Sequence, residues 1–228
     1  MSDTPPVRVI AFDVNETLLD LRALDQPFEE LLGDSSLRGQ WFAQMLQLSF
    51  VGGLTGEYID FRRAQEAALR MVAQRMGRDV PASSIVAMID RMSALPPHPE
   101  VAGALAQLRT TALRVVALVN SRHDVGEAQL RNAGLREYFD DVISADEVQS
   151  PKPSPAPYRL VAERSELPIG AVRLVAAHSW DIAGALAAGA RAAFVARPGM
   201  VLNPIGAQPD IVGPDLEQVV RRIIEVDG

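Results

Sequence analysis

The stretch Val9-Ile-Ala-Phe-Asp-Val-Asn-Glu-Thr-Leu-Leu-Asp20 decides how this chain folds. Its first four residues are apolar, as in a buried strand, and the run ends on a carboxylate, Asp13. A turn of three residues follows, and then a hydroxyl at Thr17. A buried strand normally avoids ending on a charge. The pattern therefore favours an aspartate that is ringed by backbone N–H groups and presented to a ligand as a nucleophile.

Beyond this stretch, the pattern of apolar residues changes twice. Between about Ala23 and Ala94 they recur at helical spacing with little strand signal, which indicates an inserted helical block. A proline-rich boundary, residues 96–99, ends the block. Short apolar runs then alternate with helical segments, as in a parallel, doubly wound α/β sheet with helices on both faces. We predict an α/β core over residues 1–20 and 95–228 and a small helical cap domain over residues 21–94.

The strands and helices of the core are expected to alternate along the chain. Strands are predicted at 7–12, 114–119, 141–144, 172–177, 192–196 and 211–212, and helices at 101–108, 125–132, 157–164, 181–188 and 216–226. In such sheets, ligands bind beyond the carboxyl ends of the strands. Asp13, Asn120 and residues 177–179 should therefore converge on one crevice.

Composition limits the classes of function. The chain has 228 residues, enough for a full core, with 48% hydrophobic and 22% charged residues. A net charge of −7 argues against nucleic acid and acidic membrane surfaces as partners. Cysteine is absent, which excludes disulfides and thiolate ligands and fits a reducing cytoplasm. We see no apolar run of about 20 residues and no signal-peptide pattern at the N-terminus, so we expect a cytoplasmic protein.

Four short motifs resemble those of the haloacid dehalogenase superfamily. They are Phe12-Asp-Val-Asn-Glu-Thr-Leu18, Leu118-Val-Asn120, Lys152-Pro153 and Trp180-Asp181. The helical block is similar to the superfamily's small cap, and the alternating part to its Rossmannoid core. Within the superfamily, the chain is most similar to the type II 2-haloacid dehalogenases. That likeness rests on Tyr58-Ile-Asp-Phe61, on Tyr158 after Lys152-Pro153, and on His178-Ser-Trp-Asp-Ile-Ala-Gly184.

The resemblance implies the hydrolysis of small 2-haloalkanoic acids to 2-hydroxy acids, with no metal or other cofactor. Asp13 would attack the α-carbon, displace halide and form an ester, which water would then hydrolyse. Halide is a weak base and leaves without being protonated. Asp181 would act as the base or orient the water, Lys152 would keep Asp13 ionised, and Thr17 would orient it.

The same resemblance implies a set of residues around the substrate. Backbone N–H groups of Val14 and Asn15 would bind its carboxylate. Asn120 and Phe61 would line the halide-binding site, and Trp180 would form part of the pocket wall. Tyr158 would support Lys152 or Asp13. The candidate substrate-binding residues are Val14, Asn15, Phe42, Phe61, Asn120, Ser121, Tyr158, His178 and Trp180.

Some positions depart from the type II pattern. The halide-binding arginine of the cap falls on Phe42, and the serine before Asn120 is Val119. The serine at the end of the fourth strand is Ala176, and the asparagine nearby is His178. Nearby polar residues that could substitute are Arg38, one helical turn before Phe42, and Ser121 and Arg122. The departures leave open the preferred halogen, chain length and stereochemistry.

Two other functions remain open. One is a magnesium-dependent phosphatase for a small phosphate ester. Superfamily phosphatases carry two further aspartates where this chain has Asn15 and Ala177, so a general acid and a metal ligand are missing. The other is a catalytically weakened member of the family, which Phe42 and Val119 favour. The expected partners are a small anionic substrate and, from the family likeness alone, a second copy in a homodimer.

Overall fold

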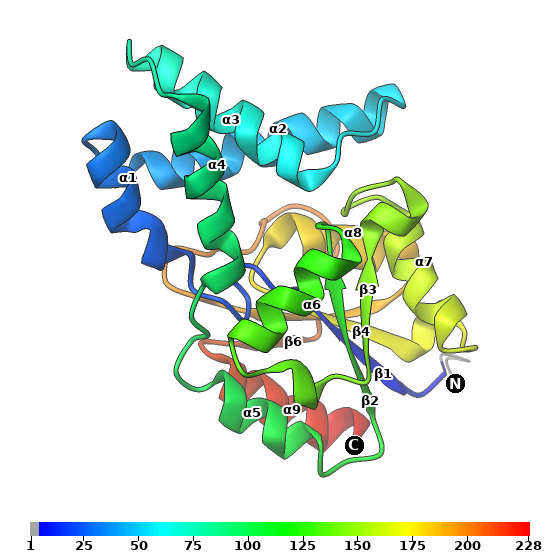
Figure 1. The fold of residues 1–228 in the computed structure, drawn as a ribbon. Helices are drawn as coiled ribbons and strands as arrows, with labels where there is room; N and C mark the ends of the chain where they lie inside the picture. The colour runs from blue at the N-terminus through cyan, green and yellow to red at the C-terminus, as the bar shows by residue number, and fades with distance from the viewer. Residues whose placement is uncertain (1–4) are drawn as a thin grey trace.

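A parallel β-sheet forms the centre of the protein in the computed structural model, which describes residues 5–228 (Figure 1). Within these residues, six strands lie in the order β3-β2-β1-β4-β5-β6, and every neighbouring pair is parallel. They are β1 (Val9–Phe12), β2 (Arg114–Val119), β3 (Asp141–Ser144), β4 (Val172–Ala176), β5 (Arg191–Val195) and β6 (Ile211–Gly213). The prediction of a doubly wound parallel sheet is confirmed.

Helices cover both faces of the sheet, because side chains alternate along each strand. Ile10 and Phe12 of β1 pack on the face covered by α5 (Val101–Leu108), α6 (His123–Asn132) and α9 (Leu216–Asp227). Val9 and Ala11 pack on the opposite face, with α7 (Pro155–Arg164) and α8 (Ser179–Ala188). Strand β1 is therefore buried on both sides, which explains its unbroken apolar run.

Four further helices lie beyond one end of the sheet (Figure 1). They are α1 (Asp25–Leu32), α2 (Leu37–Thr55), α3 (Phe61–Arg75) and α4 (Ala82–Asp90), and we call them the cap helices. Trp41 of α2 is fully buried and donates its indole N–H to the Gln65 carbonyl of α3 at 2.9 Å. Asp60 begins α3 by accepting the Arg63 backbone N–H at 3.0 Å. Helices α2 and α3 therefore pack against each other through a buried side chain.

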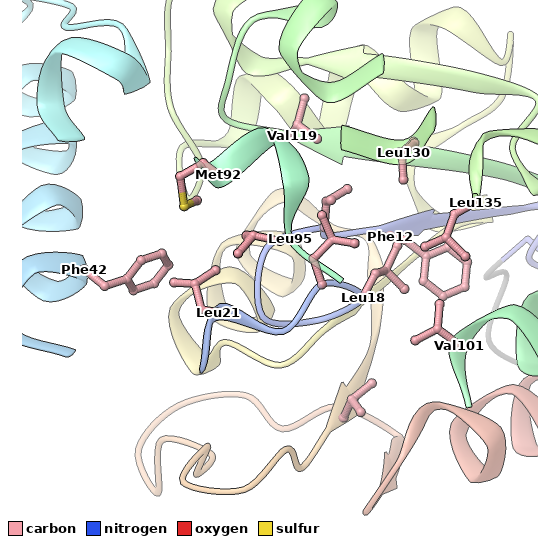
Figure 2. Packing of buried hydrophobic residues seen from close by; sticks show 14 of the residues in the cluster. Phe12, Leu18, Leu21, Phe42, Met92, Leu95, Val101, Val119, Leu130 and Leu135 are labelled. Atoms are coloured by element: carbon pink, nitrogen blue, oxygen red, sulfur yellow. The ribbon is translucent and has the colours of Figure 1, made fainter. Parts of the chain in front are cut away.

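The two chain segments that join the cap helices to the sheet lie side by side. The Asp20 backbone N–H bonds to the Pro96 carbonyl at 2.8 Å, and the His98 N–H bonds to the Leu18 carbonyl at 2.9 Å. Figure 2 shows Phe42 of α2 pointing toward Leu21, in the first of these segments. One apolar cluster thus runs from the sheet into the cap. None of the helices in the described part of the chain combines the length and apolar character of a membrane span.

Candidate active site

Asp13 lies directly after β1, in the middle of the sheet. Its backbone N–H bonds to the Val175 carbonyl of β4 at 3.0 Å. The chain then turns sharply, because the N–H groups of Leu18 and Leu19 both bond to the Val14 carbonyl. Glu16 adopts a left-handed φ of 62° within this turn. The turn leaves the Asp13 side chain buried at the carboxyl edge of the sheet.

Buried side chains contact both carboxylate oxygens of Asp13. Lys152 Nζ donates to Oδ1 at 2.8 Å, and Thr17 Oγ1 donates to Oδ2 at 2.6 Å. The Ala177 backbone N–H donates to Thr17 Oγ1 at 2.9 Å, which leaves the hydroxyl proton for Asp13. Burial opposes the negative charge, but the charge of Lys152 and a hydrogen bond from His178 outweigh it and hold the pKa of Asp13 well below its ordinary value. Asp13 is therefore ionised at neutral pH, as a nucleophile must be.

Lys152 is completely enclosed, and its ammonium has three acceptors. These are Asp13, Asp181 Oδ2 at 2.8 Å and the Leu118 carbonyl at 3.0 Å. Burial opposes its charge, but the two carboxylates raise the pKa of Lys152 above its ordinary value. It is the only lysine of the chain, against 21 arginines. A compact ammonium can meet three divergent acceptors, which a planar guanidinium cannot. This isolated lysine is a sequence signal of the site that the motif comparison did not use.

Asp181 stands behind Lys152, in the first turn of α8, and is fully buried. Its Oδ2 accepts from Lys152, and its Oδ1 accepts from the Tyr158 hydroxyl at 2.5 Å. Burial raises the pKa of Asp181, and burial together with the charge of Asp181 raises that of Tyr158. Tyr158 thus supports Asp181 rather than Lys152 or Asp13, which corrects the expectation from the sequence.

Gly184→Ala is expected to disturb the hydrogen bonds that connect Lys152, Asp181 and Tyr158. A Cβ at Gly184 would lie 2.6 Å from both the Pro153 carbonyl oxygen and the Tyr158 hydroxyl. The loop that carries Lys152 would have to shift, so we expect the free energy of unfolding in urea to fall by about 1–3 kcal/mol. Gly103→Ala is the matched control, because a Cβ there meets nothing within 4 Å, and it should be neutral or stabilising. Equal effects of the two substitutions would contradict the prediction.

A cavity of about 20 Å³ lies next to Asp13. This volume is of the order that one water molecule needs. Phe42 comes from α2 and Phe61 from α3, so the cap helices close the cavity over the strand ends. The residues that line it are Asp13, Val14, Asn15, Phe42, Leu46, Phe61, Val119, Asn120, His178 and Trp180. Closure of this kind limits the access of bulk water to Asp13.

Seven of the nine candidate substrate-binding residues line this cavity, and two do not. Ser121 borders a wider cleft of about 940 Å³ outside it, and Tyr158 lies behind Asp181. Leu46 lines the cavity but was not a candidate. It follows Phe42 by four residues on one helix, a spacing that places both side chains on the same face and that could have revealed it.

The cavity is rich in hydrogen-bond donors. Within residues 5–228, the backbone N–H groups of Val14 and Asn15 have no acceptor. The buried indole nitrogen of Trp180 also has no partner there. Asn120 accepts the Lys152 backbone N–H with Oδ1 at 2.8 Å, which leaves its amide N–H groups free for a ligand. A donor-rich, water-excluded cavity of this kind suits a small anion.

The two arginines that could have replaced Phe42 and Val119 lie elsewhere. Arg38 contacts Glu16 at 3.5 Å and Asp25, and Arg122 pairs with Asp124 at 3.1 Å beside the wider cleft. Neither lines the cavity. Neither arginine therefore places a positive charge in the cavity wall.

His178 is the lining residue that can carry a positive charge. Its ring stacks on Phe42 and on Trp180, at centroid distances of 5.6 and 5.1 Å. Its Nδ1 lies 3.2 Å from Asp13 Oδ2, and its Nε2 lies 2.8 Å from Glu16 Oε2. Burial opposes a charge on the ring, but the hydrogen bonds to Asp13 and Glu16 outweigh it and raise the pKa of His178 to about 9. The ring is a cation at neutral pH.

Comparison with known proteins points to one family. The family model for haloacid dehalogenase-like hydrolases matches residues 7–189. The (S)-2-haloacid dehalogenase 2 of Pseudomonas sp. strain CBS-3 is 31% identical over 218 residues, which cover 93% of this chain and 94% of that protein. Haloacetate dehalogenase H-2 of Moraxella sp. strain B is 28% identical over 219 residues, which cover 95% and 98%.

Solved structures agree with the sequence matches. The structure of L-2-haloacid dehalogenase from Xanthobacter autotrophicus with chloropropionic acid covalently bound has a TM-score of 0.89 at 27% identity. The match covers 96% of this chain and 98% of that chain. The sheet and the cap helices are both included in a match of this extent.

Proposed function

The chain belongs to the haloacid dehalogenase-like hydrolase family, and from this premise we propose that it hydrolyses small 2-haloalkanoic acids to 2-hydroxy acids. The enzymes named above as 2-haloacid and haloacetate dehalogenases support this substrate class. The observation that carries the proposal is the state of Asp13. It is an ionised, buried carboxylate that is held by Lys152 and Thr17 and faces a small donor-rich cavity.

In the first step, a carboxylate oxygen of Asp13 attacks the α-carbon of the substrate from the side opposite the halogen. The new C–O bond forms as the carbon–halogen bond breaks, and the halide leaves with the electron pair. Lys152 and Thr17 fix the direction of attack, which removes much of the entropic cost of the reaction. Unpaired donors of Val14, Asn15 and the Trp180 ring offer places for the substrate carboxylate and the departing halide.

In the second step, water attacks the carbonyl carbon of the Asp13 ester. The bond between that carbon and the bridging ester oxygen, which came from Asp13, breaks, which releases the 2-hydroxy acid and restores the carboxylate. One oxygen of the product then comes from Asp13, and the water oxygen stays in the side chain. Closure of the cap over the bound acid would keep bulk solvent away from the ester.

The site lies between the proposed core, residues 1–20 and 95–228, and the proposed cap, residues 21–94. Residues 1–4 of that core lie outside the described part of the chain. A cavity of about 20 Å³ cannot take a haloacid, so the cap must move to admit one. Aromatic and branched walls at Phe42, Phe61 and Val119 then leave room for a short acid. We propose haloacetates and 2-halopropionates as the preferred substrates.

A magnesium phosphatase is less well supported by the same residues. Asn15 stands where the general acid would be, and its Oδ1 accepts from Gln129 at 3.0 Å. Ala177 supplies no carboxylate. The oxygens of Asp13 and Asp181 already accept hydrogen bonds from buried side chains. This donor set does not fit a divalent cation, which needs several free hard oxygens.

A halide-release screen tests the proposed function. The substrates are chloro-, bromo- and fluoroacetate and the two enantiomers of 2-chloropropionate, each with and without EDTA. We expect halide release that EDTA does not reduce, with the (S) enantiomer preferred because the named relatives act on it. Magnesium-dependent release of phosphate from p-nitrophenyl phosphate, without halide release from any acid, would establish the phosphatase instead.

We further propose a homodimer in the cytoplasm. The dimer follows from the family likeness alone, and the location from the absence of cysteine in the sequence. Sedimentation equilibrium of the purified protein distinguishes a dimer from a monomer directly.

A further inference from the structure

Hydrolysis of the Asp13 ester needs a base that can reach the attacking water. Asp181 is poorly placed for this role, because it lies behind Lys152 and is absent from the cavity wall. Both of its oxygens are also engaged by buried donors. Among the described residues that line the cavity, the titratable ones are Asp13 itself and His178. His178 is therefore the titratable lining residue that is available as a base.

His178 has the contacts that a base for this step requires. Its Nδ1 lies 3.2 Å from Asp13 Oδ2, so a water attacking the Asp13 carbonyl carbon would come within its reach. Stacking between Phe42 and Trp180 holds the ring in that orientation. Its other nitrogen faces Glu16 at 2.8 Å.

Glu16 holds the histidine from the side away from Asp13. It faces Nε2 of His178 at 2.8 Å and also borders a separate pocket of about 260 Å³. That pocket is also lined by Arg38, His98 and Arg197 and does not include Asp13. With its Nε2 proton held by Glu16, the ring can act on the ester through Nδ1.

We propose that His178 is the general base of ester hydrolysis through Nδ1 and that Glu16 is a positioning residue, which holds the ring by accepting its Nε2–H. This inference rests on the proposed function and assigns a residue to its second step. It also gives a role to the position at which the chain carries a histidine where the type II pattern has an asparagine.

The charges around His178 are balanced in the resting enzyme. Two carboxylates, Asp13 and Asp181, are matched by Lys152 and the imidazolium of His178. Behind them, Glu16 contacts Arg38 of α2, which also pairs with Asp25 of α1. These are the charged groups that face the ring from β1, the turn after it, α8, the Lys152 loop and the cap.

Formation of the ester removes one negative charge from this cluster. Asp13 then no longer favours the protonated ring, so the pKa of His178 falls below its resting value of about 9. The ring gives up its Nδ1 proton, the one that faced Asp13, to water as the halide leaves, and it keeps its Nε2 proton on Glu16. His178 is thereby converted from a cation that accompanies the nucleophile into a neutral base.

The neutral ring then serves the hydrolysis, and all protons are accounted for. His178 takes one proton from water as the water oxygen bonds to the Asp13 carbonyl carbon. The imidazolium protonates the departing alkoxide, and the proton left on the Asp13 carboxyl returns to His178. One water proton thus ends on the product hydroxyl and the other on the ring. The net reaction is haloacid plus water to hydroxy acid, halide and one proton.

His178→Gln tests this assignment in the full-length enzyme with chloroacetate as the probe. The variant should release about one halide per active site in a burst and then turn over about 10²- to 10⁴-fold more slowly than the unmodified enzyme. Intact mass spectrometry should show the ester accumulating on residue 13. His123→Gln is the matched control, because His123 is exposed at the start of α6, and it should match the unmodified enzyme.

The pH dependence separates a base from a merely structural residue. The rate of ester hydrolysis in the unmodified enzyme should rise through one ionisation below pH 9, and His178→Gln should lack it. Glu16→Gln keeps the histidine but removes a carboxylate that favours its protonated form, so ester hydrolysis should retain the ionisation at a lower pH. If His178→Gln does not fold, the pH profile of Glu16→Gln tests the proposal by itself.

Three results would overturn or redirect the inference. Ester hydrolysis at the normal rate in His178→Gln would place the base elsewhere. A slow burst without accumulated ester would mean that His178 acts in substrate capture, which also overturns its role as the base. Absence of halide release from the unmodified enzyme would instead refute the proposed function, so the two failures are distinguishable.

Discussion

Asp13→Asn is expected to abolish dehalogenation, with kcat/KM lowered by at least about 10⁴-fold. The amide has nearly the shape of the carboxylate but no charge, so it cannot displace halide from carbon. The substitution leaves Lys152 paired with Asp181, so the variant should remain folded. Halide release measures the activity, and circular dichroism the fold. Asp79→Asn, at an exposed position of the cap, is the matched control and should be fully active.

Isotopic labelling tests the same nucleophile without a mutation. In one turnover in heavy-oxygen water, with enzyme in excess, the label should appear in Asp13 and not in the hydroxy acid. This distribution follows because water attacks the carbonyl carbon of the ester rather than the substrate carbon. Label found in the first-turnover product, with none in the side chain, would refute the ester mechanism. Substantial dehalogenation by Asp13→Asn would refute it as well.

Lys152→Met is expected to damage stability and activity together. The substitution removes the one cation that lies between Asp13 and Asp181, and leaves two buried carboxylates facing each other. Removal of one partner from a buried ion pair costs about 3–5 kcal/mol, so the free energy of unfolding should fall by that amount. Activity should fall as well, because at least one carboxylate must then take up a proton. Urea denaturation and halide release measure the two effects.

The pH dependence of Lys152→Met identifies the cause of its instability. Without the ammonium, burial keeps the pKa of Asp181 in the folded state above its unfolded value, whereas Asp13 retains its contact with His178. The folded state then binds more protons than the unfolded state, so stability falls as pH rises through the folded pKa values. The loss of unfolding free energy relative to the unmodified enzyme should therefore be smaller at about pH 5 than at about pH 8. Lys152→Arg, which keeps the charge, should lose activity with a weaker pH dependence. A loss of unfolding free energy that does not change with pH would contradict this explanation.

Much of the fold could be predicted from local pattern. The apolar run of β1 ends on Asp13 in the sequence and in the structure, because a charge without a partner is costly inside a strand buried on both faces. Strand β2 was predicted at 114–119, as observed. Helix α6 begins at His123, two residues earlier than predicted, because the apolar pattern does not extend into its polar first turn. Ends of elements depend on capping and solvent, which periodicity does not report.

The site was predicted less completely than the fold. Strand ends indicated that Asp13, Asn120 and His178 converge, because the carboxyl ends of parallel strands lie at one edge. Ser121 immediately follows Asn120, yet its side chain borders the outer cleft. Tyr158 faces Asp181 from α7, and sequence spacing cannot tell which of two neighbouring buried charges a hydroxyl will contact.

Residue order along single elements was enough to predict the type of sheet, and it pointed to a helical insertion and to Asp13 as the proposed nucleophile. The charge of His178, in contrast, depends on contacts that only the folded chain makes. Its neighbours Phe42, Glu16 and Trp180 come from a cap helix, a turn and α8, and only their packing converts a solitary histidine into a buried cation beside Asp13. The physical reason is that charge, burial and proton affinity depend on distances between groups, and segments far apart in the chain meet only when it folds.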